Sequence, residues 1–524
     1  MNTISHIYYE AVECLRSLIS DCADHPFIII SCLITFFILR NKFRRHLFSI
    51  PGPFLASLTD LWRLHSVWKA QHHKTLQALH KKYGPLVRIA PNVISVSEPS
   101  AIGTIYGIKS NYMKTGFYSP WSIAWQGKHH DGLFSAVDPV YHREQKKLVA
   151  NSFSMSSVLE SEALVDTCST LFMQQMGKIA DQNSEVDLAE WLQYYAFDVI
   201  GELSFLKKFG FLESGSDVDS MIHGLQKVLK ILTLTGQVPY TNKLFMENPL
   251  IPIFFPKMHQ QSGVIDFTVR AIQARGGSFD QKGEIEANIV GKDMLSKWTA
   301  VKNENPQKMT TTDILIHTST LVFAGSDTTA IALRAIVYFL LKSPAKLDKL
   351  VAELDAADAK GLLSEPVSYK ESITHLSYLN ACIKEAIRMH PSVGLILERF
   401  VPKGGAYFAG KFIPEGTIVG VNAWIVHNDP TIFPSPETFS PERWLEASPS
   451  KLQEMNQCWF PFGAGTRSCI GKNISMMEIS KVIPQLFREF KLYFADPNKD
   501  WAIRNYWFVQ QENLIVKLER RRGV

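Results

Sequence analysis

The segment Thr312–Leu341 constrains the fold more than any other part of the sequence. Its thirty residues are apolar on most sides, and they keep the 3.6-residue period of a helix that would be about 45 Å long. A helix of that length crosses a whole domain. Asp327 and Arg334 lie within it, and single charges are costly in lipid. The segment is therefore predicted to be a buried central helix rather than a membrane span.

The middle of this segment, Ala324-Gly325-Ser326-Asp327-Thr328-Thr329, is unusual for a core helix. Glycine weakens a helix, and hydroxyl side chains compete for backbone carbonyls. We expect a local loosening that opens a groove, with the carboxyl of Asp327 and the hydroxyl of Thr328 inside it. Such a departure from local preference indicates function, although two polar residues facing a buried water would give the same pattern.

Residues 1–45 are predicted to form a membrane anchor and residues 46–524 a single large domain. Pro26–Leu39 carries no charge, and basic residues follow it at once: Arg40, Lys42, Arg44 and Arg45. Flanking residues that can snorkel bring this run close to the roughly 20 residues that span a bilayer. Basic residues after the run favour a cytosolic domain. A buried core helix is the alternative. Ile50-Pro51-Gly52-Pro53 cannot continue a helix and predicts a stiff elbow.

Residues 46–524 are predicted to be mainly helical with small sheets attached. Hydrophobic residues make up 46% of the chain, enough for a large core, while a net charge of +5 is too weak and dispersed to predict nucleic-acid binding. The clearest further helices are Tyr194–Leu206, Leu225–Thr235, Lys346–Ala359 and Leu376–Met389. The clearest strands are Leu86–Ile89, Val93–Val96, Ala406–Phe408, Lys411–Ile413 and Ile418–Val421.

The segment Phe460–Gly471, which contains Cys469, carries the strongest chemical signal. Two glycines allow a tight turn that points backbone N–H groups at one sulfur. Arg467 and the start of a helix near Gly471 both favour a thiolate. No second Cys or His lies at zinc-ligand spacing, and no hydrolase signature surrounds the segment. A buried structural cysteine in a glycine-rich turn is the alternative.

The pattern Phe462-x-x-Gly465-x-Arg467-x-Cys469 resembles the haem-thiolate loop of the cytochromes P-450. Three companion motifs occur in the order found in that family: Ala324-Gly325-x-Asp327-Thr328-Thr329, Glu385-x-x-Arg388, and Pro441-Glu442-Arg443-Trp444, with Trp in place of Phe. Alone, Glu385 and Arg388 could be an ordinary surface ion pair. The resemblance instead implies a buried triad with Arg443. It extends from about Ile50 to the C-terminus.

The resemblance implies the cytochrome P-450 fold and a haem b site. Cys469 would be the axial thiolate ligand of the iron, and Arg467 and Arg399 would bind the haem propionates. His142 and Lys146 would join them, although the family commonly has Trp-x-x-x-Arg there and a lysine lacks the bidentate fork of arginine. Asp327 and Thr328 would be the catalytic residues, delivering protons through water.

The implied activity is that of a monooxygenase in the endoplasmic reticulum membrane, with a single span and a cytosolic catalytic domain. Electrons would come from NADPH through a separate reductase, with cytochrome b5 as a further candidate donor. Arg143, Lys146, Lys147 and Lys472 would form the docking face, unless they are merely solvated charges. Other activities stay open: peroxide rearrangement without external oxygen, and a non-enzymatic haem sensor or carrier.

The predicted substrate is a lipophilic small molecule, since the expected pocket residues are apolar. These are Trp121, Ile123, Trp125, Leu321, Ala324, Val393 and Leu395. The stretches Lys81–Asn92 and Asp138–Ser154 resemble fungal members of the family that act on secondary metabolites. Terpenoid, alkaloid and polyketide substrates all remain open.

Overall fold

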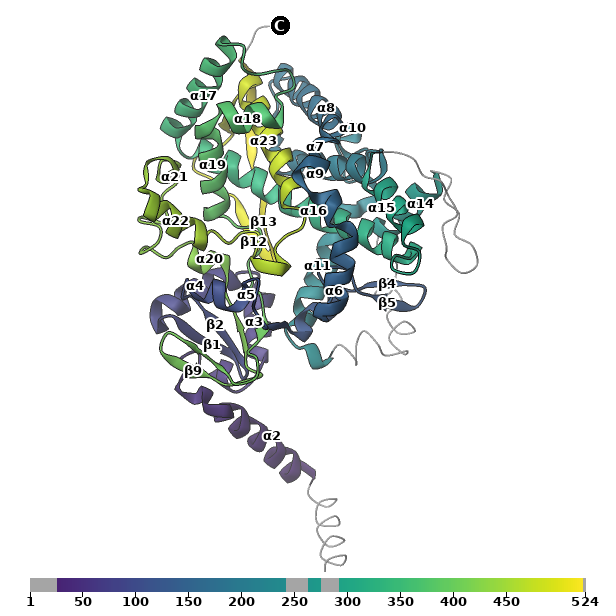
Figure 1. Ribbon diagram of the computed structural model, residues 1–524. Coiled ribbons are helices and arrows are strands. Elements are labelled where there is room, and N and C mark those ends of the chain that lie inside the picture. The colour runs from purple at the N-terminus through teal and green to yellow at the C-terminus, as the bar shows by residue number, and fades with distance from the viewer. Residues whose placement is uncertain (1–25, 242–262, 275–291, 522–524) are drawn as a thin grey trace, which may run out of the picture.

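The computed structural model of the protein describes residues 26–241, 263–274 and 292–521. Helices dominate this part of the chain, and the short strands are distributed among several places in it (Figure 1). The predicted mainly helical architecture with small sheets is confirmed. The α-helices are α2 (Pro26–Lys42), α3 (Leu61–Trp68), α4 (His72–Tyr83), α5 (Ala101–Tyr106), α6 (Pro139–Val149), α7 (Met155–Leu159), α8 (Glu162–Asp181), α9 (Leu188–Phe205), α10 (Phe211–Ser214), α11 (Met221–Gly236), α14 (Gly263–Ala274), α15 (Met294–Glu304), α16 (Thr311–Leu341), α17 (Pro344–Ala359), α18 (Tyr369–His375), α19 (Ser377–Met389), α20 (Ala423–Val426), α21 (Arg443–Glu446), α22 (Pro449–Cys458) and α23 (Lys472–Glu489).

The strands form one larger mixed sheet and several small antiparallel ones. The larger sheet has the order β1 (Leu86–Ala90), β2 (Val93–Val96), β10 (Ile418–Gly420), β7 (Arg399–Phe400) and β3 (Met113–Lys114), with β10 parallel to β2. The second sheet is β11 (Phe490–Phe494), β14 (Ile515–Arg520) and β6 (Glu185–Asp187). The remaining pairs are β4 (Ile123–Trp125) with β5 (Lys128–His130), β8 (Ala406–Phe408) with β9 (Lys411–Ile413), and β12 (Ala502–Tyr506) with β13 (Phe508–Glu512).

Helix α16 is the buried central helix that the sequence predicts. Thr310 and Asp313 close a capping box at its start, and α9, α19 and α23 pack along it. Among the described helices α16 alone is long and apolar enough to cross a membrane, but 72% of its most apolar window is buried in the protein. Gly325 lets α9 approach closely, because a Cβ there would lie 2.6 Å from Cδ1 of Ile200.

The predicted loosening in the middle of α16 is wrong. The helix is continuous from Thr311 to Leu341. The hydroxyls of Ser326 and Thr328 donate to the carbonyls of Val322 and Ala324 at 2.9 and 2.8 Å. These side-chain bonds therefore occur together with the backbone hydrogen bonds of the helix and do not replace them.

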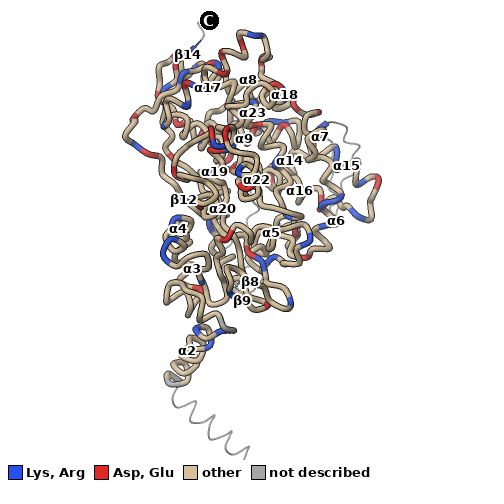
Figure 2. Tube along the Cα trace, turned by 60° about the vertical axis from the view of Figure 1, so that its left-hand side comes forward, with Lys and Arg blue, Asp and Glu red and all other residues tan. Residues whose placement is uncertain are grey.

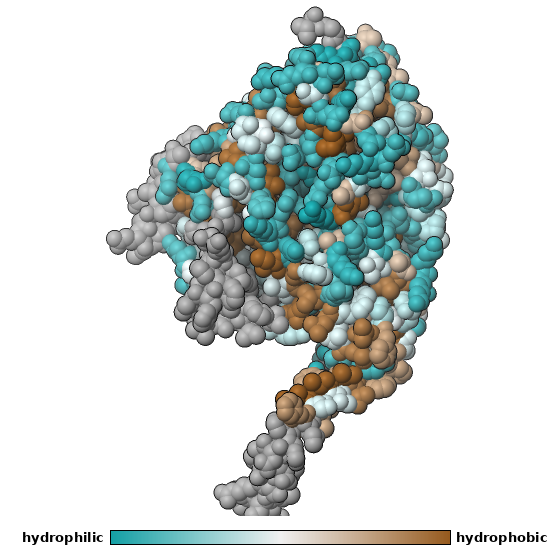
Figure 3. All heavy atoms as spheres, turned by 180° about the vertical axis from the view of Figure 1, so that it is seen from behind, coloured by the Kyte–Doolittle hydropathy of each residue, from teal (hydrophilic) through white to brown (hydrophobic). Residues whose placement is uncertain are grey.

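Helix α2 projects away from the globule (Figure 1), and most of its described side chains are exposed, including Phe27 at 85% and Phe36 at 60%. It is therefore not a buried core helix. Basic residues lie at the end of α2 that adjoins the globule (Figure 2). Its apolar surface continues onto the neighbouring part of the globule (Figure 3), where Phe43, Phe54 and Leu55 are exposed. The placement of α2 in a membrane, and the boundary at residue 45, stay predictions.

The buried side chain of Arg88 on β1 holds the chain as it leaves α2. Its guanidinium donates to the carbonyl oxygens of Asn41 at 2.5 Å, Lys42 at 3.1 Å, Leu47 at 3.4 Å and Pro91 at 2.7 Å. Arg88 is only 1% exposed. These bonds fix the exit of α2 relative to the larger sheet.

Glu385 on α19 is the centre of a buried group of side chains, called here the Glu385 cluster. Its carboxylate accepts bonds from Arg388 at 2.8 and 2.9 Å, from Arg443 at 2.9 Å and from the Trp444 indole N–H at 2.9 Å. Glu385 and Arg388 are fully buried. The surface-pair alternative is therefore excluded, and the substitution of Trp for Phe adds a donor that phenylalanine lacks.

Candidate active site

Two glycines shape the segment that carries Cys469, as predicted. Gly463 and Gly465 have φ of 66° and 64°, a conformation that side chains disfavour. A Cβ on Gly465 would also lie 1.8 Å from the carbonyl oxygen of Tyr106. The N–H of Cys469 donates to the carbonyl of Phe462 at 2.8 Å, and α23 begins at Lys472. The turn thus presents the Cys469 sulfur at the start of a helix.

The electrostatic surroundings of Cys469 differ in part from the prediction. Burial is the largest influence and raises the pKa of the Cys469 thiol, while the N–H groups of Gly471 and Lys472 and the charges of Lys472 and Lys146 lower it. The predicted donors and helix start therefore act as expected, but they do not outweigh burial. Arg467, which donates to the carbonyl of Ala136 at 2.7 Å, is not among the main charges acting on the sulfur.

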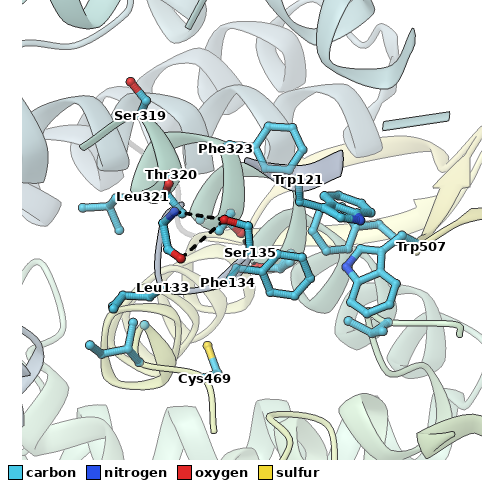
Figure 4. A pocket seen from close by; sticks show the side chains of 18 of the residues that line it. Trp121, Leu133, Phe134, Ser135, Ser319, Thr320, Leu321, Phe323, Cys469 and Trp507 are labelled. Carbon is cyan, nitrogen blue, oxygen red and sulfur yellow. Dashed lines mark hydrogen bonds between the residues drawn. The ribbon is translucent and has the colours of Figure 1, made fainter. Parts of the chain in front are cut away.

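A cavity of about 1210 Å³ extends from Cys469 to α16. It exceeds the roughly 300–1,000 Å³ that is typical of a pocket for one drug-sized ligand. Figure 4 shows Cys469 projecting into it, with Trp121, Phe134 and Trp507 gathered on one side. Most of the predicted pocket residues do line it: Trp121, Ile123, Leu321, Ala324, Val393 and Leu395. Trp125 does not line it and instead packs against the main hydrophobic core.

Four basic side chains gather beside the cavity and are called here the cavity cluster: Lys114, Lys146, Arg399 and Arg467. Lys114, Lys146 and Arg467 line the cavity, and Arg399 lies behind them, donating to Tyr118 Oη at 3.1 Å. Burial lowers the pKa of Lys114 well below its usual value, and the positive charges of Arg399 and Arg467 lower it further. None of the ion pairs within 4.0 Å in the described part of the chain includes these four residues.

His142 and Lys146 lie on α6, where the resemblance places them. His142 is buried, and its pKa is lowered to about 3 by burial first and then by Arg467, Lys114, Lys146 and Arg399. It is therefore a neutral hydrogen-bonding group. Lys146 Nζ donates to the carbonyl of Thr466 at 2.8 Å, and burial lowers its pKa. Because Lys146 faces the cavity, it does not belong to an outer docking face.

Thr328 and Asp327 lie on different sides of α16. Thr328 lines the cavity, whereas Asp327 is 1% exposed and does not line it. The amide of Gln193 on α9 donates to Asp327 Oδ1, and the amide of Gln510 on β13 donates to Oδ2 at 3.0 Å. Burial raises the pKa of Asp327 to about 6, although Arg334 and both amides act against it. This acid can exist in both protonation states near neutral pH.

The residues present fit a haem. A thiol projects into a large cavity, and the cavity cluster places basic side chains beside it without an ion-pair partner in the described chain, with Lys114 and Arg399 buried. Buried charge of this kind is costly unless a ligand of opposite charge completes it. Two propionates are such a ligand, and a soft sulfur is a suitable iron ligand.

Several residues at the site are not predicted from the sequence. Lys114 carries no motif, and its importance follows from burial beside Arg399 and Arg467. Trp507 forms the turn between β12 and β13 with φ of 74°. Gln193 and Gln510 lie 134 and 183 residues from Asp327. Among these residues only Trp507 has a local feature that indicates function, its strained backbone, and that feature is visible only in the structure.

Comparisons with known proteins agree with this geometry. A family model described as Cytochrome P-450 matches residues 50–517. The chain is 36% identical over 485 residues to the cytochrome P-450 monooxygenase cicH of Emericella nidulans, covering 92% of this chain and 96% of that protein. It is also 36% identical over 484 residues to a cytochrome P-450 monooxygenase of Aspergillus terreus, covering 91% and 96%. The monooxygenase gsfF of Penicillium aethiopicum is 35% identical over 477 residues, covering 90% and 93%.

Proposed function

Because this chain belongs to the cytochrome P-450 family and is a monooxygenase of that family, we propose that it inserts one oxygen atom from O2 into a lipophilic secondary metabolite. Terpenoid, alkaloid and polyketide substrates are the candidate classes. The observation that carries the proposal is the single cavity that reaches from the Cys469 sulfur to the polar middle of α16 and has a mostly apolar wall.

Haem b is the proposed cofactor, with Cys469 as its axial ligand. When bound, a thiolate-ligated haem supplies the activation of O2 for oxygen insertion. Arg467, Arg399 and Lys146 would hold the propionates, with Lys114 as a further cation and His142 as a neutral donor. The two carboxylates would neutralise part of this positive charge, which weakens the repulsion among the cations.

Thr328 and Asp327 are proposed to handle protons on the α16 side of the cavity. Thr328 borders the cavity and can orient a water there through its hydroxyl. Asp327 is the neighbouring acid with a pKa of about 6, so it can release a proton and regain one near neutral pH. The apolar wall keeps bulk water from the reacting atoms.

The substrate would be held by apolar and aromatic contact. Trp121, Phe134 and Trp507 lie with ring centroids 5.4 to 5.6 Å apart, and Leu395 and Phe323 extend the same wall. Such a wall favours a flat or compact lipophilic molecule over a charged one.

We propose a single membrane anchor in the endoplasmic reticulum with the catalytic domain in the cytosol. The exposed apolar helix α2 and the basic residues after it support this placement. NADPH would supply electrons through a separate reductase, with cytochrome b5 as a second candidate donor. The proposed docking face for these donors consists of three basic residues, Arg143, Lys147 and Lys472. Lys472 follows the segment Phe460–Gly471, called here the cysteine turn.

The carbon monoxide difference spectrum of the reduced holoenzyme tests the assignment. We expect a red-shifted Soret band typical of thiolate ligation, which disappears in Cys469→Ser and persists in Cys458→Ser. A histidine-type band in freshly prepared wild type would contradict Cys469 as the ligand. Oxygen uptake with NADPH and reductase then separates a monooxygenase from a peroxide-rearranging enzyme or a haem carrier, neither of which consumes O2.

A further inference from the structure

Asp327 is held by two neutral amides rather than by a cation. Gln193 donates to one carboxylate oxygen and Gln510 to the other. Arg334 lies two turns along α16, on the same side of the helix. Its guanidinium does not pair with Asp327. It donates to Gln193 Oε1 at 2.7 Å and to the carbonyl of Ala189 at 2.6 and 2.8 Å.

Gln193 thus stands between an acid and a guanidinium. Its carbonyl oxygen accepts from Arg334, and its N–H group donates to Asp327. A primary amide has both an acceptor and a donor, so one side chain can bind both partners and keep them apart. The residue is 4% exposed, so bulk water has little access to the gap that it fills.

We propose that Gln193 and Gln510 are positioning residues that keep the carboxyl of Asp327 out of an ion pair with Arg334, so that its proton can be passed to Thr328 and the cavity. The inference rests on the proposed role of Asp327 in proton delivery. A direct ion pair in a buried site would hold the carboxylate ionised and would have to be broken before the side chain could turn. Two neutral hydrogen bonds are weaker and reversible.

The charges around this group come from several elements. Arg334 acts directly on Asp327. Asp187 and Glu190 at the start of α9 and Glu512 on β13 act on Arg334 and offset part of its charge. His390, which follows α19, has a pKa lowered to about 4 by burial and is neutral. Burial raises the pKa of Asp327 although the charge of Arg334 lowers it, which agrees with an acid that is near this cation but not in an ion pair with it.

Replacing Gln510 and replacing Gln193 should shift the titration midpoint of Asp327 in opposite directions, which makes the inference testable. The infrared carboxyl band of Asp327, identified by its loss in Asp327→Asn, can be titrated in the full-length holoenzyme. Gln510→Met removes a donor, so the titration midpoint should rise by about one pH unit. Gln193→Met removes the insulating amide and lets Arg334 reach the acid, so the midpoint should fall by about one unit. Gln193→Glu keeps a partner for Arg334 and adds a negative neighbour, so the midpoint should rise.

Gln511→Met is the matched control, because the amide of Gln511 lies next along β13 and donates to the carbonyl of Ile331 at 2.9 Å instead. It should leave the midpoint unchanged. Each variant must keep the thiolate-type carbon monoxide band, which shows that the haem site is intact. If Gln193→Met folds poorly, Gln193→Asn replaces it, because an amide one methylene shorter cannot bridge both partners and the midpoint should again fall.

Oxygen consumption with NADPH and reductase gives the second measurement. Its pH profile should follow the infrared midpoint in every variant. If Asp327→Asn consumes oxygen as wild type does, the proposed role of Asp327 fails. If Asp327→Asn is slow but Gln193→Met raises the midpoint or leaves it unchanged, the insulating inference is overturned while the role of Asp327 stands.

Discussion

Two groups of basic side chains in the protein, the Glu385 cluster and the cavity cluster, differ in whether a carboxylate pairs with them. In the Glu385 cluster, Arg388 and Arg443 share one carboxylate that also accepts from Trp444. In the cavity cluster, buried Lys114 and Arg399 and half-buried Arg467 lie near one another without an ion pair in the described chain. Uncompensated buried charge is costly. The Glu385 cluster, whose charges are paired within the chain, therefore has a structural role, whereas the cavity cluster borders a cavity and is the candidate ligand site.

The largest expected effect comes from removing the carboxylate of the Glu385 cluster. Glu385→Ala leaves two buried guanidinium groups without a carboxylate, so the free energy of unfolding should fall by about 3–5 kcal/mol. Urea titration of the holoenzyme measures this change. Exposed Glu437 lies near the same segment, and Glu437→Ala should change the free energy by less than about 0.5 kcal/mol. Similar values for the two variants would contradict the structural role of Glu385.

Removing a cation from the cavity cluster should instead stabilise the haem-free chain. Lys114→Met removes a buried cation that the chain does not neutralise, so the haem-free chain should gain about 1 kcal/mol of stability. The same change removes a propionate partner, so haem release to apomyoglobin should be about tenfold faster. Lys481 is the matched case, because it is equally buried but pairs with Glu162 and Asp166 at 2.7 and 2.8 Å. Lys481→Met should destabilise the chain without speeding haem release.

A third prediction concerns His427, which joins the Glu385 cluster to the cysteine turn. Its Nδ1 bonds the carbonyl of Arg388 at 2.9 Å, and its Nε2 accepts from the N–H of Phe460 at 2.8 Å. Burial lowers its pKa from 6.5 to about 3. Below pH 6.5 the unfolded chain therefore binds a proton at His427 that the folded chain does not bind. The free energy of unfolding falls as the pH falls toward 3.

His427→Gln removes this proton difference. Between pH 6 and pH 4 the loss of unfolding free energy should become shallower by about 1.4 kcal/mol per pH unit. Urea titration across that range measures the slope. His375 is exposed, and His375→Gln should keep the wild-type slope. An unchanged slope in His427→Gln would mean that the folded chain also protonates this residue.

The smallest effect isolates the extra donor of the Glu385 cluster. Trp444→Phe restores the residue usual in the family and removes one bond to a carboxylate that keeps its arginine partners, so the cost should be about 1 kcal/mol. Trp459→Phe loses a longer bond, 3.2 Å, to the neutral carbonyl of Lys384 and should cost less. Equal thermal shifts in the two variants would show that the indole bond to Glu385 adds nothing.

The sequence predicts the elements of this fold better than the contacts between them. β2, β8 and β9 have the predicted bounds, because short alternating runs beside turn residues depend on local chemistry. Cys469, Arg467 and Thr328 are predicted through motifs that are contiguous in the chain. The loosening of α16 is wrong because the Ser326 and Thr328 hydroxyls bond carbonyls one turn back. Lys114, Gln193 and Gln510 act across distant elements, where local pattern carries no information.

The hydrogen bonds that Arg88 donates to the chain around the end of α2 determine how a shortened form of this protein should be prepared. Removing the proposed anchor is the obvious step, yet three of the four carbonyls that Arg88 binds belong to Asn41, Lys42 and Leu47. A shortened chain that begins at Ile50 would leave this buried guanidinium with Pro91 alone among those partners. A chain that begins at residue 40 loses most of the exposed apolar helix and keeps every one of them.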